Sequence, residues 1–136
     1  MKKSLILISI CFVFSFNNSC KQKNLTDVSL INGYWEIDFV KKKNEIFKPK
    51  GKSTTFDYYY LDENNGFRKK VQLLEHGILK ASNDAAYFKT LNKKNKILFL
   101  FKTEWDSWEE SLLKINSISL ILEIEGRKYF YKRIIL

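Results

Sequence analysis

The stretch GYWEIDF at residues 33–39 decides the fold class of this chain. Its apolar side chains Trp35, Ile37 and Phe39 alternate with acidic ones, a period of two that is typical of a strand with one buried face and one wet face. The same alternation returns at residues 117–125 near the end of the chain. No window of useful length favours the helical period, so the sequence predicts an all-β protein.

Further strands are expected between these two. Turn residues separate them: Asn64-Asn65-Gly66 suits a hairpin with positive φ, and Gly126 breaks the last hairpin. Residues 104–111 could be a loop in which Trp108 opens a strand, or a single helical turn. The remaining strands are predicted at 54–61, 67–75, 78–82, 86–91, 96–103, 108–115 and 127–134.

Eight or nine short strands in one small domain indicate a β-sandwich or a β-barrel. Short connections favour a meander, and a meander that closes into a small antiparallel up-and-down barrel leaves no exposed sheet edge. The sequence therefore favours the barrel, with about eight strands, over the sandwich.

The N-terminus has the pattern of an export signal. Lys2 and Lys3 precede an apolar run at 5–16, which is too short to cross a membrane as a helix, and Asn17-Asn18-Ser19 leads to Cys20. A small residue directly before a cysteine indicates lipoprotein processing. Residues 1–19 would then be removed, and Cys20 would carry the lipid. Ordinary secretion and an uncleaved anchor are the alternatives.

This prediction divides the chain into a signal peptide at 1–19, a lipidated tether at 20–32 and a β-barrel domain at 33–136. Cys11 leaves with the signal and Cys20 is acylated, so the mature chain has no free thiol. A Cys11–Cys20 disulfide is the competing interpretation, and it requires the signal to be retained.

The net charge of +9 falls to +7 when Lys2 and Lys3 are removed, because residues 1–19 contain no acidic residue. A positive charge of this size either attracts anionic lipid headgroups or reflects an ordinary lysine-rich solvated surface. Nucleic acid is not an expected partner, because an exported protein does not meet it.

Gly33, Trp35 and Arg133 carry a resemblance to a known family. A Gly-x-Trp at the start of the first strand and a closing Tyr-Lys-Arg resemble the small lipocalin-like (calycin) lipoproteins of the Bacteroidetes, over about residues 30–134. The resemblance implies that Trp35 lies across the closed end of the barrel and that Arg133 stacks on it. Trp35 could otherwise be an ordinary core aromatic.

The resemblance also implies a place in the cell. It suggests a protein held in the outer membrane of the cell envelope by the lipid on Cys20. Surface-exported members of the group often carry acidic residues after the cysteine. Residues 21–24 contain none, so we expect the protein to face the periplasm.

The sequence offers no set of catalytic or metal-binding residues. His76 is the only histidine and is expected in an exposed turn. The acidic pairs Asp62-Glu63 and Glu109-Glu110 are expected to be solvated, because neighbours on a strand face opposite ways. We therefore predict a protein that is not an enzyme and has no cofactor and no metal site.

Aromatic side chains are the candidate ligand-lining groups. Phe56, Tyr58 and Tyr60 share one face of their strand, and Phe99 and Phe101 share a face of another. An eight-stranded barrel is either filled by side chains or holds one small ligand. The first hypothesis is a lipoprotein that binds a small hydrophobic or amphipathic ligand. The second is a filled scaffold that docks on an envelope protein complex or inhibits a partner enzyme.

Overall fold

The computed structural model describes residues 27–136, so the predicted signal peptide and Cys20 lie outside the described residues. This part of the chain is mostly strand, with two short 3-10 helices, η1 (Val28–Ile31) and η2 (Glu75–Gly77). The strands are β1 (Gly33–Lys42), β2 (Glu45–Phe47), β3 (Thr55–Asp62), β4 (Asn65–Leu73), β5 (Leu79–Ala81), β6 (Ala86–Lys93), β7 (Lys96–Lys102), β8 (Ser107–Ile115), β9 (Ser119–Ile124) and β10 (Arg127–Ile134).

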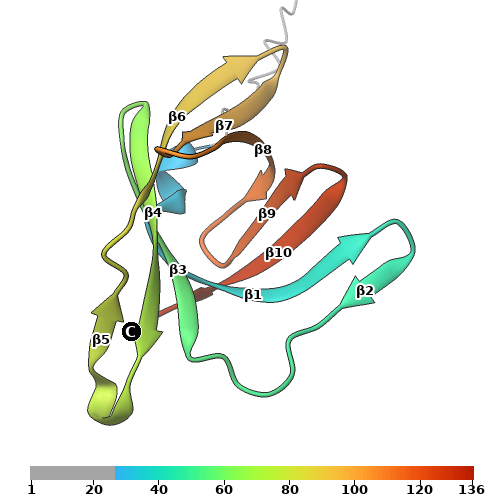
Figure 1. Ribbon diagram of the computed structural model, residues 1–136. Coiled ribbons are helices and arrows are strands. Elements are labelled where there is room, and N and C mark those ends of the chain that lie inside the picture. Colours follow the sequence, from blue (N-terminus) through green and yellow to red (C-terminus); the bar gives the residue numbers. More distant parts are fainter. Residues whose placement is uncertain (1–26) are drawn as a thin grey trace, which may run out of the picture.

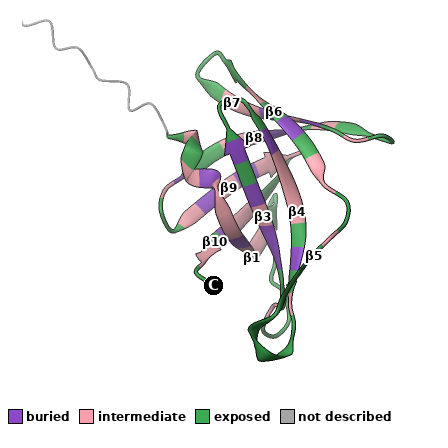
Figure 2. Ribbon diagram, turned by 90° about the vertical axis from the view of Figure 1, so that its left-hand side faces the viewer, coloured by how far each residue is buried: buried purple, intermediate pink, exposed green. Residues whose placement is uncertain are grey.

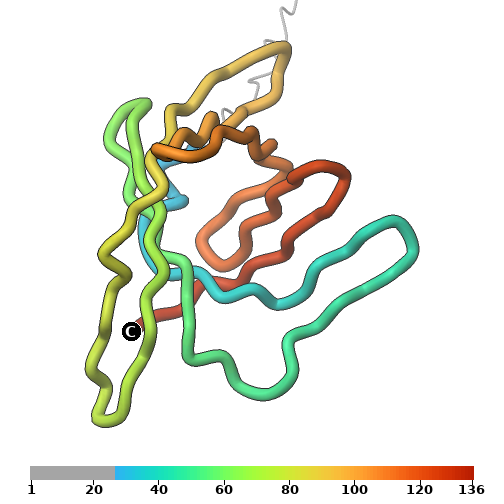
Figure 3. Tube along the Cα trace, viewed as in Figure 1, coloured from blue at the N-terminus to red at the C-terminus, as the bar shows by residue number. Residues whose placement is uncertain are grey.

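Eight of these strands form a closed antiparallel barrel (Figure 1). The order β10-β9-β8-β7-β6-β4-β3-β1 follows the chain, and β10 then pairs with β1 to close the ring. In Figure 3 the first strand, in cyan, runs beside the last, in red. The prediction of an all-β, up-and-down barrel is confirmed, and the sandwich is excluded.

Two short strands lie outside the ring. β2 pairs only with the outer half of β1 and forms a hairpin that projects from the barrel (Figure 1), and β5 pairs only with the end of β4. β2 was not among the predicted strands, because all three of its residues are exposed and show no alternation. The uncertain segment at 104–111 contains a turn followed by β8, with Trp108 at its second position.

The core fills the barrel interior and is covered at one end by η1. Ile31 of this short helix is fully buried among core residues, and Asn32 bonds to the backbone of Leu61 through its side chain. Residues 28–32 therefore belong to the folded unit, although the sequence analysis assigned them to the tether. Burial alternates along the barrel strands, as Figure 2 shows for β3, whose inward residues are Asp57, Tyr59 and Leu61.

β1 contains a β-bulge that changes which side chains face inward. Ile37 is paired with Tyr131, but the register then shifts, so that Phe39 is paired with Phe130 and Val40 with Tyr129. Phe39 stacks on Phe130 outside the barrel, with ring centroids 4.2 Å apart. Val40 takes the inward place that simple alternation would give to Phe39.

Gly66 lies in β4 rather than in the turn before it. The residue with positive φ is Glu63, in the turn itself. A Cβ on Gly66 would lie 2.5 Å from Cζ of Phe88 and 2.5 Å from the carbonyl oxygen of Tyr60. This glycine is required by close packing, not by the turn conformation that the sequence analysis gave as its reason.

Candidate functional site

The closed end of the barrel is built around Trp35. Its ring is fully buried, and its Nε1 donates a hydrogen bond of 2.7 Å to the carbonyl oxygen of Ile31 in η1. Arg133, at the end of β10, lies over the ring with its guanidinium carbon 4.2 Å from the ring centroid. A cation over an indole face is attracted by the ring quadrupole, so this contact joins the first and last strands of the barrel.

Arg133 also binds three backbone carbonyls. Its guanidinium donates to the carbonyl oxygen of Asn32 at 2.8 Å, to that of Ser117 at 2.6 Å and to that of Leu30. Burial lowers the pKa of Arg133 below its ordinary value. The residue ties η1 and the turn before β9 to the floor of the barrel, which is the place that the resemblance implied for it.

Gly33 makes room for this arginine. Its φ of 124° is unfavourable for other residues, and a Cβ on it would lie 2.7 Å from Nη1 of Arg133. Gly33, Trp35 and Arg133 therefore form one structural unit at the barrel floor.

The aromatic residues predicted on β3 face the outside of the barrel. The inward positions are held by Asp57, Tyr59 and Leu61, each 7% exposed or less, so the sequence analysis placed the wrong face of β3 inside. One face of this strand has three aromatic residues, whereas the other face contains Asp57. A period-two pattern assigns the face with the acidic residue to water, and this led to the wrong prediction. Phe56 is buried opposite Val71, but outside the main core cluster; Tyr58 and Tyr60 are exposed to a greater extent.

These outward rings form what we term the outer aromatic row: Tyr34, Tyr58, Tyr60, Phe67 and Tyr87. Ring contacts link all five members, with Phe67 in contact with three of them. Centroids are 4.9 Å apart for Tyr34–Tyr58, 5.5 Å for Tyr60–Phe67, and 6.2 Å for both Tyr58–Phe67 and Phe67–Tyr87. The row crosses β1, β3, β4 and β6 on the outer surface. Trp105, in the loop before β8, is 88% exposed and is not a member of this row.

Phe99 and Phe101 face inward and pack in the core, and Phe101 also borders a cavity of about 470 Å³ beside β6 and β7. They are almost fully buried, and Phe88 contacts both rings at centroid distances of 5.1 and 4.9 Å. Trp108 stacks on Phe101 at 4.9 Å with parallel rings. The part of the barrel between β6 and β8 is therefore a packed aromatic core.

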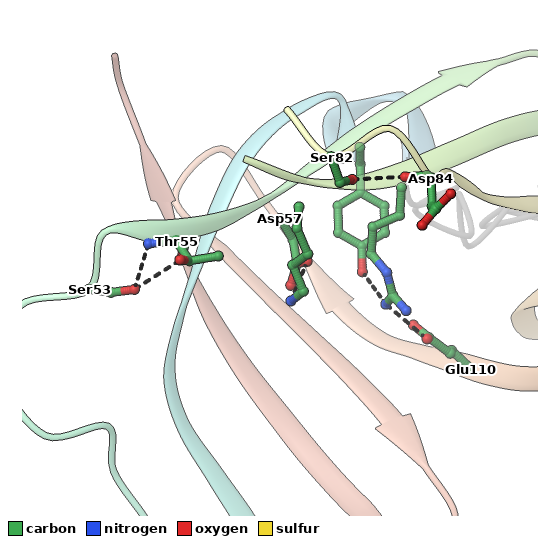
Figure 4. A network of polar contacts seen from close by, with 9 residues as sticks. Ser53, Thr55, Asp57, Ser82, Asp84 and Glu110 are labelled. Atoms are coloured by element: carbon green, nitrogen blue, oxygen red, sulfur yellow. Dashed lines mark hydrogen bonds and ion pairs between the residues drawn. The ribbon is translucent and has the colours of Figure 1, made fainter. Parts of the chain in front are cut away.

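A charged network crosses the same interior. Glu110, predicted to be solvated, is fully buried on β8, and its Oε1 accepts hydrogen bonds from Arg68 Nη1 at 3.0 Å and from Trp108 Nε1 at 2.9 Å. Arg68 also donates to the Tyr59 hydroxyl at 3.0 Å (Figure 4). The spacing of Trp108, Glu110 and Leu112 along β8 would have revealed this position, because residues two apart share a face.

Burial changes the proton affinities of this network. It raises the pKa values of Tyr59 and Tyr131 well above their usual range, with Arg68 opposing the rise. Burial alone would lower the pKa of Arg68, but Tyr59 and Glu110 beside it raise that pKa above its ordinary value. At neutral pH both tyrosines are uncharged, and the arginine is a permanent cation inside the barrel.

A cavity of about 390 Å³ opens at the end of β1 remote from η1, and we term it the mouth cavity. Its apolar wall comes from the inner face of β1, from Phe47 of β2 and from Pro49. Its polar side comes from Lys48, from β3 and β4 and from the segment before β3. The lining residues are Trp35, Ile37, Val40, Phe47, Lys48, Pro49, Ser53, Thr55, Asp57 and Lys70.

Asp57 is the buried acid of this cavity. It is 2% exposed, and Lys70 Nζ lies 2.7 Å from its Oδ1 (Figure 4). This oxygen accepts no hydrogen bond of ordinary geometry, although the ion pair is short. The pair is therefore an electrostatic contact and not a well-oriented hydrogen bond. The lysine side chain is 60% exposed.

His76 and the acidic side chains form no further site within the described residues. His76 is exposed in η2 with a φ of 60°, in agreement with the predicted turn. Between residues 27 and 136, no group of three His, Cys, Asp or Glu side chains is placed to hold a metal ion. No helix in the same range has the length and apolarity needed to cross a membrane.

Comparison with known proteins gives likenesses of structure only. No family model and no curated protein matches the chain. A lipocalin-like protein from Bacteroides uniformis is similar with 17% identity and a TM-score of 0.48, over 77% of this chain and 99% of that one. An uncharacterized protein from Bacteroides eggerthii is 11% identical with a TM-score of 0.48, over 76% and 98%.

Lobster apocrustacyanin A1 is 10% identical with a TM-score of 0.46, over 79% of this chain and 63% of that one. Likenesses this distant carry no argument about activity. The closed eight-stranded ring and the Arg133–Trp35 contact stand independently of them. On these features the chain has a lipocalin-like fold.

Proposed function

We propose that this protein binds a small apolar or amphipathic molecule in the mouth cavity and catalyses no reaction. One observation carries the proposal: a cavity of about 390 Å³ that is apolar on one side and has a buried carboxylate, Asp57, on the other. Ligand sites are commonly concave and largely apolar, with a few placed polar groups that fix orientation. Phe88, Phe99 and Phe101 pack together deeper in the barrel, so the proposed ligand lies at its mouth.

Fluorescence titration with N-phenyl-1-naphthylamine, a neutral apolar probe, tests the proposal. The Cys20→Ala chain serves as the background, so that no detergent competes for the probe. We expect saturable binding, and we expect Val40→Trp to weaken it at least tenfold, because an indole at this position occupies the cavity.

Lys41→Trp is the matched control, since Lys41 is the exposed neighbour of Val40 on the same strand. It should leave the affinity within about twofold. Absence of saturable binding, or equal losses in the two tryptophan variants, contradicts the proposal.

The site of action is part of the same proposal. The Ser19-Cys20 sequence after a basic and apolar segment supports a lipid anchor on Cys20, hence a location in the outer membrane facing the periplasm. The Cys20→Ala variant should move from the membrane fraction to the soluble fraction, and metabolic labelling with palmitate should be lost. Retention of the variant in the membrane fraction contradicts the anchor.

The outer aromatic row supports a second candidate function, docking onto an envelope protein. Tyr60 and Tyr87 are 44% and 63% exposed, and aromatic side chains are enriched in protein interfaces. A photo-reactive phenylalanine analogue at position 87 should crosslink in intact cells to one discrete partner. The same analogue at the isolated Trp105 is the control, and identical products from both positions contradict a specific surface.

A further inference from the structure

Two buried carboxylates, Asp57 and Glu110, face the interior of the barrel. Glu110 is paired with Arg68, and Asp57 with Lys70, two cations that share the inward face of β4. Tyr59 and Tyr131 remain uncharged, because burial raises their pKa values.

The two buried acids are neutralised in different ways. Glu110 is bonded to Arg68 and Trp108 inside the barrel. Asp57 instead depends on Lys70, which reaches it from the rim while most of the lysine side chain stays in water. A buried carboxylate needs a cationic or hydrogen-bonding partner, but nothing in this geometry requires that partner to come from the protein.

Asp57 and Lys70 also stand between two cavities. Both residues line the mouth cavity, and both line a second cavity of about 360 Å³ that is bordered by Arg68, Ser82, Asp84 and Thr103. A ligand in the mouth cavity therefore meets the Asp57–Lys70 pair, and Lys70 has free space on its other side.

We propose that the ligand is a small apolar amine whose ammonium group replaces Lys70 at Asp57 while its apolar part packs against Trp35, Ile37 and Val40. This inference rests on the proposed function and names the chemical class of its ligand. Alkyl ammonium groups have pKa values near that of lysine, about 10.4, and are charged at neutral pH. The exchange of one ammonium for another keeps Asp57 neutralised and returns Lys70 to water.

An anionic or neutral ligand lacks this advantage. A carboxylate that draws Lys70 away leaves Asp57 buried without a cation, which is strongly unfavourable. An alcohol leaves the pair in place and gains only apolar contact. The order of affinity should therefore be ammonium, then alcohol, then carboxylate, for one and the same alkyl chain.

Displacement of N-phenyl-1-naphthylamine by octylamine, octanol and octanoate at pH 7 tests this order. We expect octylamine to displace the probe at concentrations at least tenfold lower than octanol, with octanoate the weakest. Asp57→Asn should abolish the preference for octylamine and leave octanol within about twofold. The matched control is Glu36→Gln, because Glu36 forms an ion pair with Lys132 at 3.2 Å and borders neither cavity.

Lys70→Ala provides a second variant in which Asp57 is intact. Removing the competing ammonium should tighten octylamine binding about fivefold or more and leave octanol unchanged, even if Asp57→Asn proves unable to fold. Probe binding with equal displacement by octylamine and octanol overturns the amine inference and leaves the proposed function standing. If the probe itself does not bind, both are overturned.

Discussion

Arg133 lies over the ring of Trp35 at 4.2 Å, although the two residues belong to opposite ends of the domain sequence. The strands that carry them, β10 and β1, are the pair that closes the barrel. The arginine therefore stabilises the closure between β1 and β10. Its hydrogen bonds to the carbonyl oxygens of Leu30 and Asn32 also hold η1 against the closed end of the barrel.

Arg133→Ala should reduce the free energy of unfolding by about 2–4 kcal/mol, since a cation–π contact and charge-assisted hydrogen bonds are lost together. Urea denaturation followed by tryptophan fluorescence measures the change. Arg127→Ala, at an exposed position of the same strand, should change stability by less than about 0.5 kcal/mol. Equal effects at the two positions would show that the contacts of Arg133 with Trp35 and η1 do not contribute to the free energy of unfolding.

Gly66→Ala should destabilise the protein by about 1–3 kcal/mol, because the added methyl group meets Phe88 and the backbone of Tyr60 at 2.5 Å. Gly51 is the comparison, since a Cβ there has no atom within 4 Å. Gly51→Ala should cost only about 1 kcal/mol, from its positive φ. Thermal unfolding of both variants distinguishes a packing requirement from a backbone requirement.

The Arg68–Glu110 pair should show strong coupling. Replacing either residue alone by methionine leaves a buried charge without its partner, at a cost of about 3–5 kcal/mol. The double replacement should cost less than either single one, because no unpaired charge remains. A double-mutant cycle of urea denaturation measures the coupling energy, and additive single effects would contradict the buried pair.

Stability should fall at alkaline pH. The folded protein holds the pKa values of Tyr59 and Tyr131 above the value of about 10 expected in the unfolded chain. The unfolded state therefore loses protons first, so the contribution of each tyrosine is complete below pH 10 and is lost as the pH rises further, by up to about 1.4 kcal/mol per pH unit. Tyr59→Phe should reduce this slope between pH 9 and 11, whereas Tyr60→Phe, at an exposed position, should not.

The strand pattern was predictable from the sequence because most barrel strands alternate cleanly. Trp35 and Ile37 mark the inner face of β1, and Leu120 and Leu122 that of β9, so the outline of the barrel followed from the period-two pattern. The short β2 was not predictable, since Ile46 and Phe47 are exposed and their position depends on pairing with β1 alone.

The candidate site was harder to predict, because polar residues occupy inward positions. Asp57 and Glu110 are assigned to water by any hydrophobic pattern, yet Lys70 and Arg68 compensate them from the neighbouring strand or across the barrel. Such pairs depend on which strands become neighbours. Tyr58 was assigned to the inner face because an alternating aromatic residue resembles a core residue in the sequence. In the structure it belongs to the outer aromatic row.

The register shift in β1 sets the size of the space left at the mouth. If Asp38 were paired regularly and the register did not shift, Phe39 would face inward, and a phenyl ring would stand where the isopropyl group of Val40 now borders the cavity. The shift also provides Phe39 with Phe130 as an external stacking partner. The bulge at Asp38 thus lets a segment with regular alternation in its sequence present a small side chain at the mouth and place the larger ring of Phe39 outside.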